Sequence, residues 1–245
     1  MHEEPPEGLQ RMAGQNRSQD MAGVERRFTE VVVEVRADGA SKRIGGYAAQ
    51  FDKLSQNLGG FVERVAPSFF NKSRGDGWPG VQARYNHDDN MLLGTSDART
   101  LELRLDEYGL WYDVEPPASR ADVLELVARG DVRRSSFAFR LPREGGDEWS
   151  LSDQGYPLRS LVSGALVDVA PVNTAAYLDT SVGLRSLAEA KDADVEEVRA
   201  LAEQNELRRL FVVTSAGGPA KPAPKRLFGP AAVAAVLARR EDPWG

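Results

Sequence analysis

The chain contains 245 residues, of which 41% are hydrophobic and 28% are charged, so it can bury the core of one large soluble domain with tails. Its formal net charge of -6 argues against a general nucleic-acid binder, because such proteins gain affinity by neutralising phosphates. The absence of cysteine excludes disulfides, thiolate metal sites and a cysteine nucleophile.

The first strands are predicted to follow a polar arm. Residues 1–26 are rich in Glu, Gln, Pro and Gly and have few large apolar groups, which is typical of a disordered segment. The alternating, β-branched stretch 28–36 predicts a strand, 37–40 a turn and 43–51 a second strand, so the two form a hairpin. The pair Gly45-Gly46 inside the second strand indicates a bulge or the close approach of another backbone.

Further short strands are predicted up to residue 115. Residues 61–65 are expected to form a strand and 66–70 a single helical turn, followed by a loop at 71–80. The same alternation predicts four more strands, at 81–87, 92–95, 99–105 and 110–115. His87 lies where the first of these meets a polar stretch, which is a common position for a functional side chain on a rigid support.

A helix is predicted to lead directly into a strand that carries two serines. Residues 120–129 have apolar spacings of three and four, a capping-box-like start at Ser119 and Asp122, and a stop at Gly130. The next stretch, 133–140, alternates strictly and predicts a half-buried strand. Because its two phenylalanines must face the core, Ser135 is expected to point inward with them, and Ser136 outward in an accessible position.

The rest of the chain divides into strands, a helix and a tail. Residues 142–157 are loop-like, whereas 158–172, dense in Val and Leu, predict one or two strands. Residues 188–212 predict one amphipathic helix, and 213–245 a Pro/Gly/Ala linker with a short helical tail. The compact domain is therefore placed at 27–187, with a fold that is mainly β with helices (α+β).

Three side chains stand out as candidates for chemistry. The chain has two histidines, and since His2 lies in the arm, a base that works near neutral pH must be His87. Asp168 lies in the apolar stretch 158–172, where a carboxylate is costly unless it is paired or hydrogen-bonded. With Ser136 these are the residue types of a serine-nucleophile triad. Taken singly, two of them have an open structural alternative: Ser136 as an ordinary polar-face serine, and Asp168 as a helix cap or an acceptor of backbone hydrogen bonds.

Several motifs resemble those of the prohead proteases of tailed bacteriophages, the serine endopeptidases that mature capsids. The resemblance covers about residues 27–185, with matching order and rough spacing. The matching stretches are IGGYAAQF (44–51), FVERVAPSFF (61–70), YNHD (85–88), LGT (93–95), GLW (109–111), RGDVRRSSFAF (129–139) and VDVAPVNTAAY (167–177).

The resemblance implies a role for each candidate. The family's serine precedes a Phe-or-Ile, small, Phe triplet, as Ser136 does, which implies Ser136 rather than Ser135 as nucleophile and His87 as general base. The family's acid, often Glu, is Asp168 here. The family is similar in fold to the herpesvirus maturation proteases (assemblin), which implies a closed β-barrel flanked by helices, with a helical C-terminal tail. Those proteases use a second histidine as third member; this chain has none available, which favours Asp168.

The implied function is limited proteolysis inside the procapsid, in the cytoplasm of the infected bacterial host. The expected substrates are the scaffold or the scaffolding segment of the major capsid protein, and the protease itself. A homo-oligomer is left open, and no cofactor, metal, nucleic acid or membrane partner is expected. The sequence agrees with a cytoplasmic location, because it has no apolar run of membrane-spanning length and no apolar signal-peptide core. The alternative is a non-enzymatic β-barrel module that binds scaffold during capsid assembly.

Overall fold

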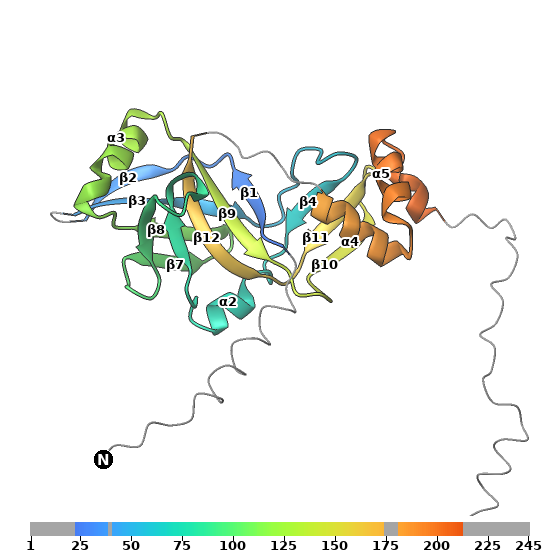
Figure 1. Cartoon of the computed structure of the whole chain (residues 1–245), viewed down its shortest axis with the longest axis horizontal. Helices are drawn as coiled ribbons and strands as arrows, with labels where there is room; N and C mark the ends of the chain where they lie inside the picture. Colours follow the sequence, from blue (N-terminus) through green and yellow to red (C-terminus); the bar gives the residue numbers. More distant parts are fainter. Residues whose placement is uncertain (1–22, 39–40, 174–180, 213–245) are drawn as a thin grey trace, which may run out of the picture. The chain divides into compact units, whose positions relative to one another are not determined.

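The computed structural model describes residues 23–38, 41–173 and 181–212, which belong to one compact unit ending at Val212 (Figure 1). Its helical elements are α2 (Asn71–Gly75), η1 (Tyr85–His87), η2 (Ala118–Arg120), α3 (Ala121–Arg129), α4 (Ser181–Lys191), α5 (Val195–Glu203) and η3 (Leu207–Phe211). Its strands are β1 (Glu25–Thr29), β2 (Glu34–Asp38), β3 (Ser41–Gln50), β4 (Val62–Val65), β5 (Gln82–Arg84), β6 (Leu92–Thr95), β7 (Leu101–Leu105), β8 (Gly109–Val114), β9 (Arg134–Arg140), β10 (Asp147–Leu151), β11 (Pro157–Leu161) and β12 (Ala165–Val172). The predicted arm at 1–22 and the linker and tail at 213–245 lie outside the described residues.

The strands pair in three sheets, and the fold is mixed α+β with mostly sheet, in agreement with the predicted class. The five-stranded sheet has the order β1-β9-β12-β5-β6, the four-stranded sheet β2-β3-β8-β7 and the three-stranded sheet β10-β11-β4. Most neighbours are antiparallel, but β12 pairs with β5 and β11 with β4 in parallel. The predicted closed barrel is not confirmed, because the hydrogen-bonded ladders of the described residues divide into these three sheets.

Four phenylalanine rings form the centre of the main core. Phe69 and Phe70 precede α2, and Phe137 and Phe139 point inward from β9, with ring centroids 4.8 to 5.5 Å apart. The predicted inward direction of the two β9 rings is thus confirmed. Gly164 permits this packing, because a Cβ atom there would lie 2.3 Å from Phe69 Cζ.

A second core lies beneath the C-terminal helices, where Leu58 and Phe61 pack against apolar residues of α4, α5 and η3. The predicted single helix at 188–212 is wrong, because these three elements replace it. The turns between them contain left-handed residues, Asp192 with φ of 49° and Asn205 with φ of 56°. These turns let both helices bury their apolar faces in one cluster. None of the described helices is long and apolar enough to cross a membrane.

The predicted strand at 28–36 is broken in two. Its first part belongs to β1, which pairs with β9, and its second part to β2, which pairs with β3 in a different sheet. The predicted hairpin exists between β2 and β3. The bulge or close backbone approach predicted from Gly45-Gly46 is also confirmed. A Cβ atom on Gly45 would lie 2.6 Å from the carbonyl oxygen of Tyr112, and the register of β3 shifts between Tyr47 and Ala49.

Three further local predictions were wrong. The helical turn expected at 66–70 is displaced to α2, in a stretch predicted as loop. The loop expected at 142–157 contains β10, whose polar residues are held by pairing with β11. Ser119 does not cap α3, because it lies in the preceding turn η2 and leaves Arg120 at the N-cap. The predicted stop is confirmed, since Gly130 is left-handed with φ of 84°.

Candidate active site

The two serines of β9 lie on opposite faces of the strand. β9 runs between β1 and β12, and Ser136 lies opposite Phe28 on one side and Ala170 on the other. Ser135 points into the core, as predicted, where its hydroxyl forms a 3.0 Å hydrogen bond with the hydroxyl of buried Tyr112. The side chain of Ser136 therefore emerges on the face opposite the core rings, on a strand held from both edges.

Ser136 is not accessible in the way the strand pattern predicted. Only 1% of its surface is exposed. The alternation correctly directs it away from the phenylalanine rings, but its hydroxyl lies within hydrogen-bond distance of the His87 ring and of the backbone carbonyl of Arg27 in β1. Alternation along one strand cannot reveal that other segments cover the face opposite the core.

His87 is positioned by a turn with unusual backbone angles. The chain leaves β5 through η1, where Asn86 and His87 are left-handed, with φ of 54° and 58°. Left-handed backbone is strained for residues other than glycine, and such strain is often found at functional sites. The side-chain oxygen of Asn86 accepts the backbone N–H of Asn173, just after β12, which ties the turn to the neighbouring strand. The His87 side chain is 5% exposed.

Asp168 reaches His87 because of the sheet topology. It lies on β12, opposite Gln82 of β5 on one side and Ala138 of β9 on the other, with a register shift between Leu166 and Asp168. The parallel pairing with β5 brings the strand that precedes His87 beside the strand of the acid. Asp168 is 1% exposed, and both of its oxygens are engaged: Oδ1 by His87 and Oδ2 by Arg84.

The three predicted residues form a continuous hydrogen-bonded line. His87 Nδ1 lies 2.5 Å from Asp168 Oδ1, and His87 Nε2 lies 2.7 Å from Ser136 Oγ. Since an ionised carboxylate can only accept, Nδ1 must carry the proton, which leaves Nε2 as an acceptor for the serine hydroxyl. This tautomer is the one in which imidazole can remove a proton from the serine.

Arg84 is a member of the site that sequence reasoning missed. Its Nη1 donates to Asp168 Oδ2 at 3.1 Å and also pairs with the exposed Asp89 at 2.8 Å. A cation at this position pairs with the buried carboxylate and orients it toward His87. The sequence indicated Arg84 only through its position three residues before His87. An arginine on the polar face of a strand is ordinarily solvated, so this position alone did not point to the site.

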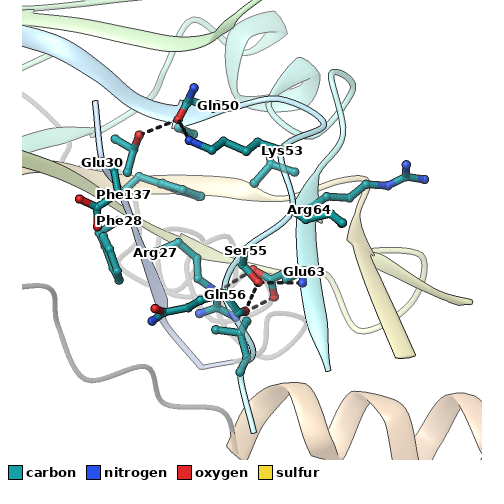
Figure 2. Close-up of a pocket in the computed structure, with 15 residues that line it drawn as sticks. Arg27, Phe28, Glu30, Gln50, Lys53, Ser55, Gln56, Glu63, Arg64 and Phe137 are labelled. Carbon is teal, nitrogen blue, oxygen red and sulfur yellow. Dashed lines mark hydrogen bonds and ion pairs between the residues drawn. The ribbon is translucent and has the colours of Figure 1, made fainter. Parts of the chain in front are cut away.

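One cavity lies beside β1, and His87, Ser136 and Asp168 are not among the residues that line it. It has a volume of about 230 Å³ and is bounded by β1, by residues 53–56 and by β4, as Figure 2 shows. Among the residues that the structure describes, no group of three or more His, Cys, Asp or Glu side chains is arranged to hold a metal ion.

Comparison with known proteins identifies a family. A family model described as caudovirus prohead serine protease matches residues 30–193, about two thirds of the chain. The chain belongs to this family. The resemblance predicted from the motifs is therefore confirmed, and the protein is a serine peptidase of the phage prohead with a role in capsid maturation. No curated protein and no solved structure matches the chain. The matched region of this prohead protease contains His87, Ser136 and Asp168, whereas β1 precedes it.

Proposed function

We propose that Ser136, His87 and Asp168 are the catalytic triad of this prohead protease, with Ser136 as nucleophile. The observation that carries the proposal is the position of His87, whose two ring nitrogens lie within 2.7 Å of a serine hydroxyl and a buried carboxylate. Ser135 is disfavoured as nucleophile, because its hydroxyl is buried in the core and hydrogen-bonded to Tyr112, on the face of β9 opposite that of Ser136. A base within hydrogen-bond reach and an orienting acid are what activate a serine.

The proposed reaction is acyl transfer to serine followed by hydrolysis. Ser136 Oγ attacks the substrate carbonyl carbon while His87 Nε2 takes the hydroxyl proton, and Asp168 stabilises the imidazolium that forms. The carbon–nitrogen bond then breaks as His87 returns the proton to the leaving amine. Water, deprotonated by the same imidazole, cleaves the acyl ester and restores the serine. Arg84 contributes indirectly, by holding the carboxylate in the direction of the ring.

The proposed substrates are the scaffold or the scaffolding segment of the major capsid protein, and the protease itself, cut inside the procapsid within the infected cell. Family membership supports the capsid-related role. The alternative, a non-enzymatic assembly module, makes the opposite prediction about covalent reactivity, because a serine without an activating base does not react with a fluorophosphonate probe.

The decisive experiment compares fluorophosphonate labelling of the wild-type chain with that of Ser136→Ala, His87→Ala and Ser135→Ala. Labelling is expected in the wild type and in Ser135→Ala, and loss in the other two variants. Processing of the capsid protein should be lost with Ser136→Ala in assembling procapsids. Undiminished labelling or normal processing with Ser136→Ala would refute the proposed nucleophile.

A further inference from the structure

β1 occupies the open edge of the strand that carries the proposed nucleophile. It pairs antiparallel with β9 along its whole length, from Glu25 opposite Phe139 to Thr29 opposite Ser135. In the five-stranded sheet it is the outermost strand. A peptide that adds a strand to a sheet edge is a common way for proteins to bind extended segments. β1 also lies before residue 30, where the match to the protease family begins.

The backbone carbonyl of Arg27 lies against the nucleophile. Ser136 Oγ is 2.8 Å from this oxygen, close to its 2.7 Å distance from His87 Nε2. Since a C=O bond is about 1.23 Å long, the carbonyl carbon lies at most about 4.0 Å from Ser136 Oγ. Reaction requires an approach of about 3–3.5 Å. The hydroxyl of Ser136 donates to this oxygen, and the carbonyl carbon of the Arg27–Phe28 peptide bond lies at most about 0.5 Å beyond that range.

The side chain of Arg27 is bound in a buried acidic site on β4. Its Nε and Nη2 donate to the two carboxylate oxygens of Glu63 at 2.6 and 2.8 Å, as Figure 2 shows, and the two side chains are 9% and 3% exposed. This forked geometry selects arginine over lysine, whose single ammonium cannot make two parallel bonds. The neighbouring Arg26 is exposed, so β1 buries one of its two consecutive arginines.

A second charged residue of β1 is bound next to the first. Glu25 accepts hydrogen bonds from both terminal nitrogens of Arg159 on β11, at 2.7 and 3.1 Å, and Arg159 is fully buried. Arg159 and Glu63 are register partners on adjacent strands, so their charged groups form a paired receiving site. Burial alone would raise the pKa of Glu25, but hydrogen bonds and charge from Arg159, with the charge of Arg27, hold it below its ordinary value.

We propose that β1 is bound as a substrate strand, and that the site cuts this chain after Arg27, with Glu63 binding the arginine and Arg159 binding the acid two residues before it. The inference rests on the triad proposed above and adds the bond and the residues that select it. The pattern Glu-x-Arg is then expected to precede bonds that the protease cuts in other chains.

The proposed cleavage requires no component beyond water. Ser136 Oγ forms a bond to the carbonyl carbon of Arg27, and its proton passes to His87 Nε2. The bond between that carbon and Phe28 nitrogen breaks, and the nitrogen takes the proton from His87. Water then hydrolyses the Ser136–Arg27 ester, which releases a fragment ending in the Arg27 carboxylate and a chain beginning at Phe28.

The test is intact mass and N-terminal sequencing of the purified full chain. The wild type is expected to acquire a new N-terminus at Phe28, and Ser136→Ala to stay uncut at this bond. Arg27→Gln is expected to slow this cut at least about tenfold, because the buried carboxylate of Glu63 loses the two parallel hydrogen bonds from the guanidinium of Arg27. Arg26→Gln is the matched control, since it removes the same charge from the exposed neighbour and should leave the rate within about twofold.

Fluorophosphonate labelling separates this inference from the proposed function. A wild-type chain that labels at Ser136 but keeps the Arg27–Phe28 bond intact would overturn the inference and leave the triad standing. A wild-type chain that does not react with the fluorophosphonate would overturn the triad itself. Equal slowing by Arg26→Gln and Arg27→Gln, in variants with unchanged thermal unfolding, would overturn the role of Glu63. Should Arg27→Gln fail to fold, Arg27→Lys, which retains the charge without the fork, is expected to give intermediate cleavage.

Discussion

Replacing Asp168 with asparagine tests the third member of the proposed triad without changing the size of the side chain. Arg84 can only donate, so the asparagine oxygen would turn toward it and the amide NH2 would face His87 Nδ1. That nitrogen would then have to accept, and the ring proton would move to Nε2, where it faces Ser136. Imidazole in this tautomer cannot take the serine proton.

The expected loss is large and can be measured directly. In the serine-protease template this kind of substitution lowers kcat by about 10⁴, which corresponds to about 5 kcal/mol of transition-state stabilisation. The assay is the rate of fluorophosphonate labelling of Ser136, with thermal unfolding as the check on folding. Asp89→Asn is the control, because Asp89 pairs with the same Arg84 nitrogen but is 82% exposed. We expect the control within about twofold of wild type. An Asp168→Asn chain that keeps more than a tenth of the wild-type rate would refute the orienting role of Asp168.

Three further outcomes follow from individual contacts. Gly164→Ala should lower the free energy of unfolding by about 2 kcal/mol in urea titration, because its Cβ would meet the ring of Phe69 at 2.3 Å; an unchanged midpoint would contradict this packing. Ser135→Ala should cost about 1–3 kcal/mol, since it leaves the hydroxyl of buried Tyr112 unpaired, and labelling should persist. The depressed pKa of Glu25 contributes stability above its ordinary value of 4.5, and this contribution is lost as pH falls through the lower folded value. The stability difference between wild type and Glu25→Gln should therefore shrink from pH 6 to pH 3; a difference that grows would contradict it.

Short-range patterns predicted much of the strand framework. The alternation around Phe137 and Phe139 correctly directed Ser135 inward and Ser136 away from the rings. Successive side chains of a strand point to opposite faces, so burial of the two phenylalanines on one face fixes the direction of both serines. The scarcity of histidine then drew attention to His87. That these residues lie together could not be derived from spacing, because it depends on the parallel pairing of β12 with β5.

The features that sequence reasoning missed depend on contacts between distant segments. Arg84 looks like a solvated strand residue until β12 brings Asp168 beside it. β10 is composed mainly of polar and charged residues, and pairing with β11 rather than its own pattern makes it a strand. The division of 28–36 into β1 and β2 also follows from partners, since each part pairs in a different sheet. Propensity within a segment cannot predict such choices.

The burial of Ser136 has a consequence for how the proposed protease would act on other chains. A substrate strand can reach the nucleophile only if it takes the edge of β9, and in this structure β1 holds that edge. β1 brings one cation and one anion into the buried cluster, so its departure would leave the charge there unchanged. Glu63 and Arg159 would keep each other as partners at 3.1 Å, and Asp147 would stay paired with Arg159 at 2.6 Å. Because neither receiving residue would be left as an isolated buried charge, exchange of β1 for another strand avoids the largest penalty of opening a buried ion network. Cleavage after Arg27 would weaken the hold of β1 further, by dividing the strand directly after the arginine that Glu63 binds through two hydrogen bonds.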